Sequence, residues 1–181
     1  EAVDLYSVPV NGSLPPLKIN VDLPANNSVG LDFRITEDNR HVIFRAPQET
    51  TNVDELFVVP IRGPASAAVK LNGPLVFPGR VWGFRVSPEG SRVVYWADPT
   101  TPIQLELFSV PIEGPAGEAV RISPTLTAGG AVIEYRISPD GMRVVFTADA
   151  LQDEVPELFS VPIDGPGSAA VKLNLPLVAD G

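Results

Sequence analysis

The sequence predicts an all-β fold, and three observations support this class. The 20 prolines and 15 glycines are spread too densely for long helices, and no stretch shows apolar residues at helical spacing. Several short segments alternate apolar and polar residues and end at turn-forming residues, as half-buried strands do. One phrase of sequence also recurs at a fixed period. Together they predict a β-propeller of four-stranded antiparallel blades, with about three and a half blades in this chain as an open segment.

The recurring phrase carries most of this prediction. It is "ELFVVPIRGPASAAVKLN" at 55–72, "ELFSVPIEGPAGEAVRIS" at 106–123 and "ELFSVPIDGPGSAAVKLN" at 157–174, with a divergent copy at 1–20. Two sets of landmarks recur every 51 residues: Leu5, Leu56, Leu107 and Leu158, and Pro9, Pro60, Pro111 and Pro162. Sandwiches and barrels seldom repeat sequence at fixed spacing, and a β-solenoid would need a shorter period.

Each unit is expected to hold four strands, A to D. Strand A is typified by "VWGFRVS" (81–87), whose alternation predicts that Trp82, Phe84 and Val86 share one face. A tight turn follows, "SPEG" or "SPDG", with glycine in the left-handed conformation; Asn39 takes that place in the first unit. Strand B ("RVVYWAD"), strand C ("ELFSVPI") and, after a Gly-Pro turn, a short strand D ("AVRIS") complete the unit.

The stretch "RISPDGMRVVFTAD" (136–149), followed by "ELFSVPIDG" (157–165), closely resembles the TolB-like, WD40-related repeat, often called PD40. The resemblance covers essentially the whole chain. It implies four-stranded blades arranged radially, usually six to eight in a closed ring. The first unit departs from the motif, since "TEDNRHVIFRAP" (36–47) lacks the Pro-Asp-Gly turn and the Ala-Asp ending.

The repeat divides 1–181 into one propeller segment with four parts. We expect an outer half-blade with a connecting loop at 1–28, and blades at 29–79, 80–129 and 130–181. Three and a half blades cannot close a ring, and open sheet edges invite pairing with another chain. We therefore expect a slice of a longer repeat protein, or an assembly in which other chains supply strands. Two copies give seven blades by count, but both lack the same A–B hairpin, so simple dimer closure is awkward.

Composition limits the partners. A net charge of −9 and a pI near 4.5 argue against nucleic acid, which needs clustered lysine and arginine. No apolar run approaches the ~20 residues of a membrane span. The chain has no cysteine, shows no signal-peptide pattern and opens on Glu1, which fits an extracellular or periplasmic segment released from a longer precursor. Asn11 and Asn26 begin N-x-S sequons, which matter only in a eukaryotic secretory setting.

A repeated arginine on strand A is the first candidate for chemistry. It could line an anion site, or it could form a structural ion pair between blades with the repeating acids. We favour the ion pair, because a residue present in every blade usually has a structural role in the blade. The arginines are Arg34, Arg85 and Arg136, and the acids are Glu55, Glu106, Glu157, Asp98 and Asp149.

The position two residues before each arginine varies between units, as Asp32, Gly83 and Glu134. A binding surface along the central channel would vary in this way, but drift at a tolerant position is the interpretation we favour. Trp82 and Trp96 are expected in the blade core, although glycan stacking is an alternative. At each strand-C proline, the pairing with strand D is expected to end or to bulge.

No metal, cofactor or catalytic site is predicted. The acidic loop 148–157, with Asp149, Asp153, Glu154 and Glu157, lacks the order of a calcium loop, and His41 stands alone where other units have arginine. Catalytic and phosphate-binding motifs are absent. Our leading hypothesis is a non-enzymatic scaffold that binds a protein partner or copies of itself. The alternatives are a self-assembling subunit of a fibre or ring, and an accessory propeller of a larger hydrolase.

Overall fold

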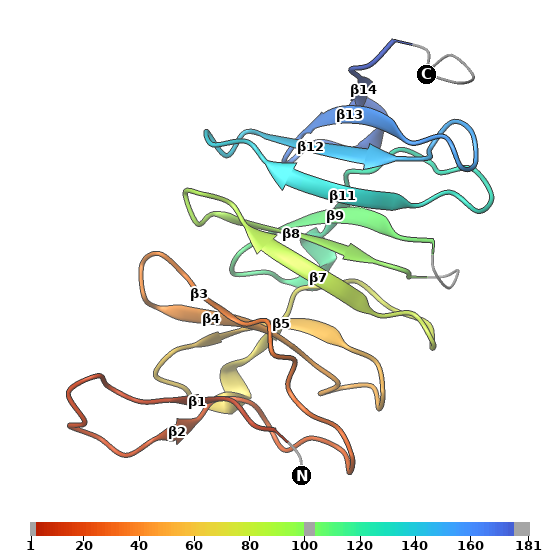
Figure 1. The fold of residues 1–181 in the computed structure, drawn as a ribbon. Helices are drawn as coiled ribbons and strands as arrows, with labels where there is room; N and C mark the ends of the chain where they lie inside the picture. Colours follow the sequence, from red (N-terminus) through yellow and green to blue (C-terminus); the bar gives the residue numbers. More distant parts are fainter. Residues whose placement is uncertain (1–2, 100–103, 176–181) are drawn as a thin grey trace.

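The computed structural model describes residues 3–99 and 104–175, so the ends of the predicted segments 1–28 and 130–181, and part of 80–129, lie outside it. Its fourteen strands form one two-stranded sheet and three four-stranded antiparallel sheets, stacked in chain order (Figure 1). The half-sheet is β1 (Tyr6–Ser7) with β2 (Leu17–Lys18). This confirms the predicted all-β open propeller of three and a half blades.

Each four-stranded sheet runs in the order A-B-C-D, as predicted. The first holds β3 (Arg34–Ile35), β4 (His41–Ala46), β5 (Glu55–Pro60) and β6 (Val69–Lys70). The second holds β7 (Val81–Val86), β8 (Arg92–Ala97), β9 (Glu106–Pro111) and β10 (Val120–Arg121). The third holds β11 (Val132–Ile137), β12 (Arg143–Ala148), β13 (Glu157–Pro162) and β14 (Val171–Lys172).

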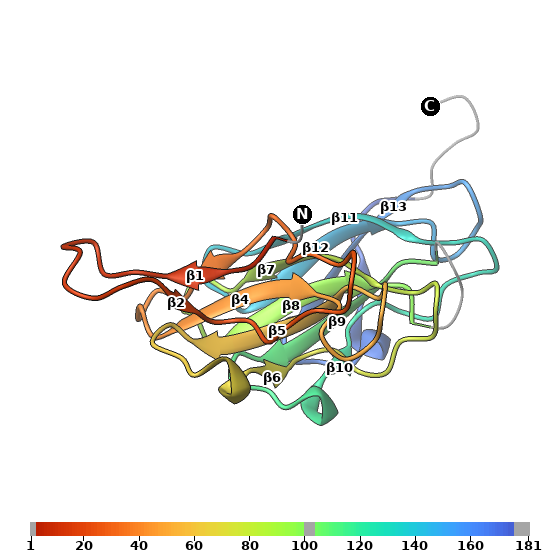
Figure 2. The ribbon, with the colours of Figure 1, turned by 90° about the horizontal axis from the view of Figure 1, so that it is seen from below.

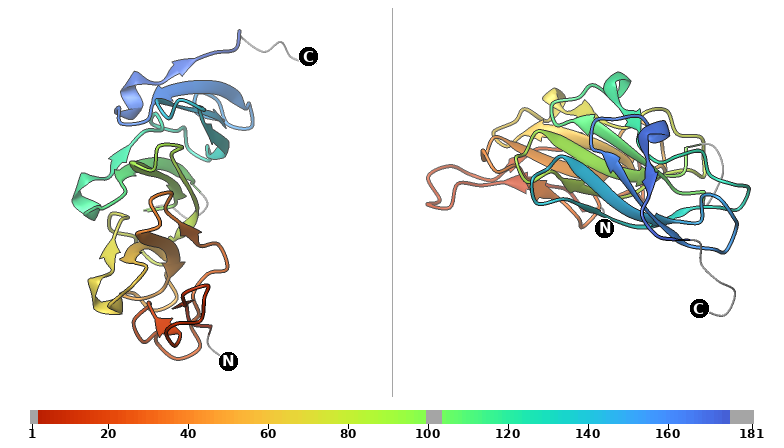
Figure 3. Two further views of the ribbon diagram at one scale, coloured as in Figure 1. Left: turned by 90° about the vertical axis from the view of Figure 1, so that its left-hand side faces the viewer. Right: turned by 90° about the horizontal axis from the view of Figure 1, so that it is seen from above.

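One short 3₁₀ turn follows strand C in each four-stranded sheet, and the sequence did not predict it. The turns are η1 (Ala65–Ala67), η2 (Ala116–Glu118) and η3 (Gly167–Ala169), and all three project from the same side of the stack (Figure 3). The loop between β1 and β2, which has no such turn, extends beyond the stacked sheets (Figure 2).

The turns between strands A and B form as expected. Gly90 and Gly141 adopt φ values of 73° and 72°, and Asn39 adopts 57° in the first unit. The hydroxyl that opens each turn accepts a hydrogen bond from the first backbone N–H of strand B; Ser87, for example, accepts from Arg92 at 3.0 Å. The first unit therefore forms the same turn, although it lacks the Pro-Asp-Gly sequence.

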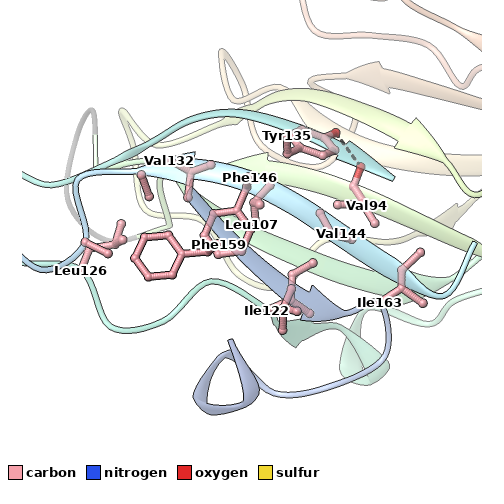
Figure 4. Close-up of a cluster of buried hydrophobic side chains, with 13 residues drawn as sticks. Val94, Leu107, Ile122, Leu126, Val132, Tyr135, Val144, Phe146, Phe159 and Ile163 are labelled. Atoms are coloured by element: carbon pink, nitrogen blue, oxygen red, sulfur yellow. Dashed lines mark hydrogen bonds between the residues drawn. The ribbon is translucent and has the colours of Figure 1, made fainter. Parts of the chain in front are cut away.

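Three apolar clusters lie between successive sheets. We call the face of a sheet that looks toward the next sheet along the chain its rear face, and the opposite face its front face. Leu107 and Ile122 on the second rear face pack against Val132, Phe146 and other residues of the third sheet (Figure 4). The same arrangement joins the half-sheet to the first sheet and the first sheet to the second. Stacking of rear on front faces therefore builds the core.

The alternation predicted for strand A is wrong at its start. The β7–β8 register shifts between Val81 and Gly83, so Trp82 bulges out of the ladder and its exposed fraction is 44%. The extra residue interrupts the two-residue period, which places Val81 rather than Trp82 in the core. An equivalent bulge lies at Ile133 in β11, whose pairing shifts between Val132 and Glu134.

Pairing between strands C and D is confined to two residues, as the proline position predicts. In the first sheet it joins Phe57 to Lys70 and Val58 to Val69, and it stops two residues before Pro60. The Pro60 carbonyl then accepts a hydrogen bond from the N–H of Gly63, which closes the turn. The proline ends the ladder because it has no N–H to donate.

Candidate functional site

The strand-A arginines line two neighbouring clefts, which we together call the inner trough. One part is a cleft of about 380 Å³ bordered by Arg34, Arg85 and Arg136 from β3, β7 and β11. A neighbouring cleft of about 260 Å³ shares Arg34, Phe84 and Arg85 with it and adds Asp32, Trp82, Gly83, Trp96, Glu134 and Tyr135. Two sets of residues singled out in the sequence are thus brought together.

The three arginines are exposed and have different contacts. Arg34 donates to the carbonyl of its neighbour Phe33 at 2.8 Å. Arg85 lies with its guanidinium carbon 5.5 Å from the centre of the Tyr135 ring in the next sheet. Arg136 forms an ion pair of 2.5 Å with Glu134 on its own strand, where both side chains are largely exposed. A surface pair of this kind contributes little to stability, so the guanidinium groups remain accessible to a ligand.

The ion pairs predicted between these arginines and the strand-C acids are wrong. Each strand-C glutamate instead pairs with the basic residue of strand D in its own sheet: Glu55 with Lys70, Glu106 with Arg121, and Glu157 with Lys172. In the half-sheet, Asp4 pairs with Lys18 at 3.0 Å. The C–D ladder places these side chains beside each other, whereas strand A lies at the opposite edge of the sheet.

The two strand-B aspartates accept hydrogen bonds from backbone N–H groups. Asp98 accepts a hydrogen bond from the N–H of Arg80 at 2.6 Å, and Asp149 accepts one from the N–H of Ala131. Both acids therefore fix the chain that enters strand A of their own sheet.

The variable position on strand A is matched to the residue opposite it on strand B. Gly83 faces Trp96, and a Cβ on Gly83 would stand 2.8 Å from the Trp96 indole nitrogen. In the first sheet Asp32 accepts from Nε and Nη2 of Arg45 at 3.0 and 2.8 Å. Gly83 and Asp32 each fit the residue that lies beside them on strand B, and the drift favoured from the sequence stays a prediction.

Sequence reasoning missed Arg45. Its Nη1 also donates to the Val81 carbonyl at 2.7 Å and so links the first sheet to the second. The register of the A–B hairpin could have revealed this contact. Positions 45, 96 and 147 recur every 51 residues and lie opposite the variable position on strand A. The residue type at these positions changes together with the residue type at the variable position.

The trough is apolar as well as charged, since its lining carries the three arginines together with Asp32, Glu37 and Glu134. Trp82 stands half-exposed at its border, with the Arg80 guanidinium carbon 5.2 Å from the ring centre. Leu31 and Ile133 occupy the same repeat position and are also exposed, as are Phe33 and Ile35 near Arg34. Trp82 is therefore not a core residue, whereas Trp96 packs edge-on against Tyr135 with the ring centres 5.4 Å apart.

Tyr135 forms the buried wall of the trough. Its hydroxyl donates to the Val94 carbonyl of the preceding sheet at 2.9 Å, and burial raises the pKa of this phenol well above its ordinary value. A tyrosine held protonated and engaged in this way joins two blades and is not poised as an acid or base.

The remaining candidates are dispersed. Across the described ranges, no group of three or more His, Cys, Asp or Glu side chains is placed to hold a metal ion. The acids of the 148–157 loop have separate contacts, such as that of Glu157 with Lys172. His41 replaces an arginine whose counterparts Arg92 and Arg143 each donate to a serine of strand C. In the first sheet, Val58 takes the place of that serine.

Comparison with known proteins bears on the fold. No protein-family model matches the chain, and no curated protein matches it. Among solved structures it is similar to a protein from Agrobacterium tumefaciens provisionally assigned as TolB, with 18% identity and a TM-score of 0.57. The chain has a TolB-like β-propeller fold. The match covers 94% of this chain and 55% of the other, so the chain spans about half the length of the structure it matches. Within the described residues, no helix is long and apolar enough to cross a membrane.

Proposed function

We propose that the chain is a non-enzymatic propeller segment that acts as a protein-binding scaffold, and that its partner lies along the inner trough. The observation that carries this proposal is the alignment of three exposed arginines with exposed aromatic and aliphatic side chains in a protein of net charge −9. Arginine and tryptophan are enriched where protein interfaces bind most tightly.

The chemistry of the trough favours an acidic, extended segment of the partner. Guanidinium groups bind carboxylates through paired, charge-assisted hydrogen bonds, and Arg34, Arg85 and Arg136 recur once per sheet along the trough. The half-exposed ring of Trp82 offers an apolar contact between such carboxylates. A partner segment that alternates acidic and apolar side chains matches this order.

Binding of labelled peptides tests the proposal. We expect a peptide of alternating glutamate and leucine to bind, and the matching peptide of lysine and leucine not to bind, when both are followed by fluorescence anisotropy. The double variant Arg34→Ala/Arg85→Ala should weaken binding at least about tenfold. Arg62→Ala, an exposed arginine in the loop between β5 and η1, is the matched control and should leave binding unchanged. Equal binding of both peptides, or an equal loss in the control, would refute the trough as the site.

The absence of catalysis and the location outside the cytoplasm belong to the same proposal. Both rest on the sequence, which lacks the catalytic motifs considered above and lacks cysteine. A chemical activity of the isolated chain that disappears when one named residue is replaced would overturn the first. Fractionation of the producing cells tests the second, and recovery in the cytoplasm would contradict it.

A further inference from the structure

A cleft separate from the inner trough lies between the first and second sheets, and we call it the interblade cleft. Its volume is about 310 Å³, and none of the described residues that line it belongs to the trough. A cavity of about 150 Å³ accepts benzene. The interblade cleft therefore has room for an aromatic ring that carries a short side chain.

The walls of the interblade cleft are aromatic and aliphatic. Tyr95 on β8 and Phe108 on β9 stack with their ring centres 5.3 Å apart and 16° between the ring planes. Pro74 and Leu75, from the segment that follows β6, also line the cleft. Leu75 is half-buried and packs against the core between the two sheets. Walls of this kind are typical of sites for small ligands that contain a ring.

The turn η2 leaves this space open because it carries a methyl group where η3 carries none. Gly167 of η3 is buried, and a Cβ on it would overlap the carbonyl oxygen of Ser123, so η3 lies directly against the preceding sheet. Ala116 occupies the same repeat position in η2, is half-buried, and lines the interblade cleft. Leu126 has an exposed fraction of 9%, whereas Leu75 at the same position is only half-buried.

The second sheet also places a hydroxyl group in the cleft. Tyr95 stands where the first and third sheets have Phe44 and Phe146, and its exposed fraction is 2%. Burial raises the pKa of the Tyr95 phenol well above its ordinary value, and the opposing hydrogen bond with the Gly73 backbone does not cancel this effect. The phenol is therefore neutral and protonated at neutral pH.

Glu106 supplies the charge of the interblade cleft, because among the described lining residues no other side chain is charged. Its side chain is 16% exposed, against 2% for Glu55 and 8% for Glu157 at the same repeat position. Glu106 Oε1 accepts a hydrogen bond from Nη1 of Arg121 at 2.8 Å. A carboxylate has about four acceptor positions, so Glu106 can accept from a further donor.

We propose that the interblade cleft binds a small aromatic amine in its protonated form. The ring lies against Tyr95, Phe108 and Leu75, and the ammonium group donates to Glu106. Such a hydrogen bond is strong because both partners are charged, and the net charge of −9 attracts a cation further. An anion of the same shape is repelled. The site is independent of the proposed peptide site, because the two have no described lining residue in common.

Titration followed by amide NMR spectra tests the ligand class. The probes are phenethylamine, the neutral phenethyl alcohol and the anionic hydrocinnamate, all at neutral pH. We expect phenethylamine to shift the amide signals of Gly73 and Ala119, which line the cleft. Phenethyl alcohol should bind at least about tenfold more weakly, because it lacks the charge-assisted hydrogen bond. Hydrocinnamate should not bind.

Two variants test the site. Ala116→Leu fills the cleft and should abolish binding of phenethylamine, whereas Ala65→Leu, at the same position of η1, is the matched control and should leave it unchanged. Glu106→Gln keeps the shape of the side chain, and should reduce the affinity for phenethylamine to that for phenethyl alcohol without changing the latter.

Three results would overturn the proposal. The first is the absence of binding by phenethylamine, and the second is equal affinity for phenethylamine and hydrocinnamate. The third is unchanged binding of phenethylamine by Glu106→Gln or by a folded Ala116→Leu variant, since the amine would then bind elsewhere.

Discussion

Individual charged side chains hold strands C and D together in every unit. Lys70 contacts Glu55, whose side chain is 2% exposed, and Glu49 at 3.0 Å. Burial alone would lower the pKa of Lys70, but the hydrogen bonds with Glu55 and Glu49 outweigh it and raise the pKa. The hydrogen bond from Asn20, followed by that from Lys18, lowers the pKa of Asp4 below 3.8.

These shifts predict a stability plateau between acid and alkaline limits. The lowered pKa of Asp4 contributes stability above pH 3.8, and this contribution is lost as the pH falls through the folded value. The raised pKa of Lys70 contributes stability below pH 10.5, and this is lost as the pH rises through the folded value. Urea unfolding at a series of pH values measures both limbs. Asp4→Asn should flatten the acid limb, and a free energy of unfolding that rises below pH 3.8 would contradict this account.

Residue-scale features were the least predictable from the sequence. The sequence placed Glu55, Glu106 and Glu157 on strand C correctly but chose the wrong partners, because a repeat shows which residues recur and not which edges of a sheet meet. The bulge at Trp82 was missed for a related reason: one extra residue leaves the composition of a strand unchanged.

Within a sheet, a side chain at the end of strand D completes the short C–D pairing. The Oδ1 atom of Asn72 accepts from the buried N–H of Leu56 at 2.6 Å, and its Nδ2 donates to the Gly73 carbonyl at 2.8 Å. The half-sheet repeats this contact with Asn20, and Ser123 accepts from Leu107 in the second sheet. Strand D pairs with strand C over only two residues, so the hydrogen bond to the side chain at the end of strand D extends the contact between the two strands.

Removing the Asn72 side chain should therefore destabilise the protein. Asn72→Ala leaves the Leu56 N–H buried without an acceptor, which costs about 1–3 kcal/mol. Asn72→Ser should cost less, because Ser123 makes the equivalent contact in the second sheet. Chemical denaturation measures both free energies of unfolding. Equal losses of unfolding free energy in the two variants would show that the side-chain acceptor for the Leu56 N–H is not the cause of the destabilisation.

At the scale of strands, the sequence predicted much of the structure. Period-two alternation and the turn residues placed strands A to D in the right order, and Asn39 was correctly expected at positive φ. The 3₁₀ turns η1 to η3 were not predicted, because three-residue turns leave no periodicity to detect.

The whole molecule is a stack in which one interface is used repeatedly. The 51-residue period made this architecture predictable, because identical units bury their faces most simply against one another. The inner trough was predicted only in part. The sequence suggested its arginines and its variable position separately, but the stacking of β3, β7 and β11 brings them to two neighbouring clefts.

Distances between equivalent sites in successive sheets test this stacking most directly. The chain lacks cysteine, so cysteine pairs for spin labels can be introduced at the exposed, equivalent positions Arg62, Glu113 and Asp164. Pulsed electron paramagnetic resonance should give the same distance for 62–113 as for 113–164. The 62–164 distance should be longer than either and shorter than their sum, because blades lie on an arc. Unequal neighbouring distances, or a 62–164 distance no longer than one step, would contradict the repeated stacking of blades.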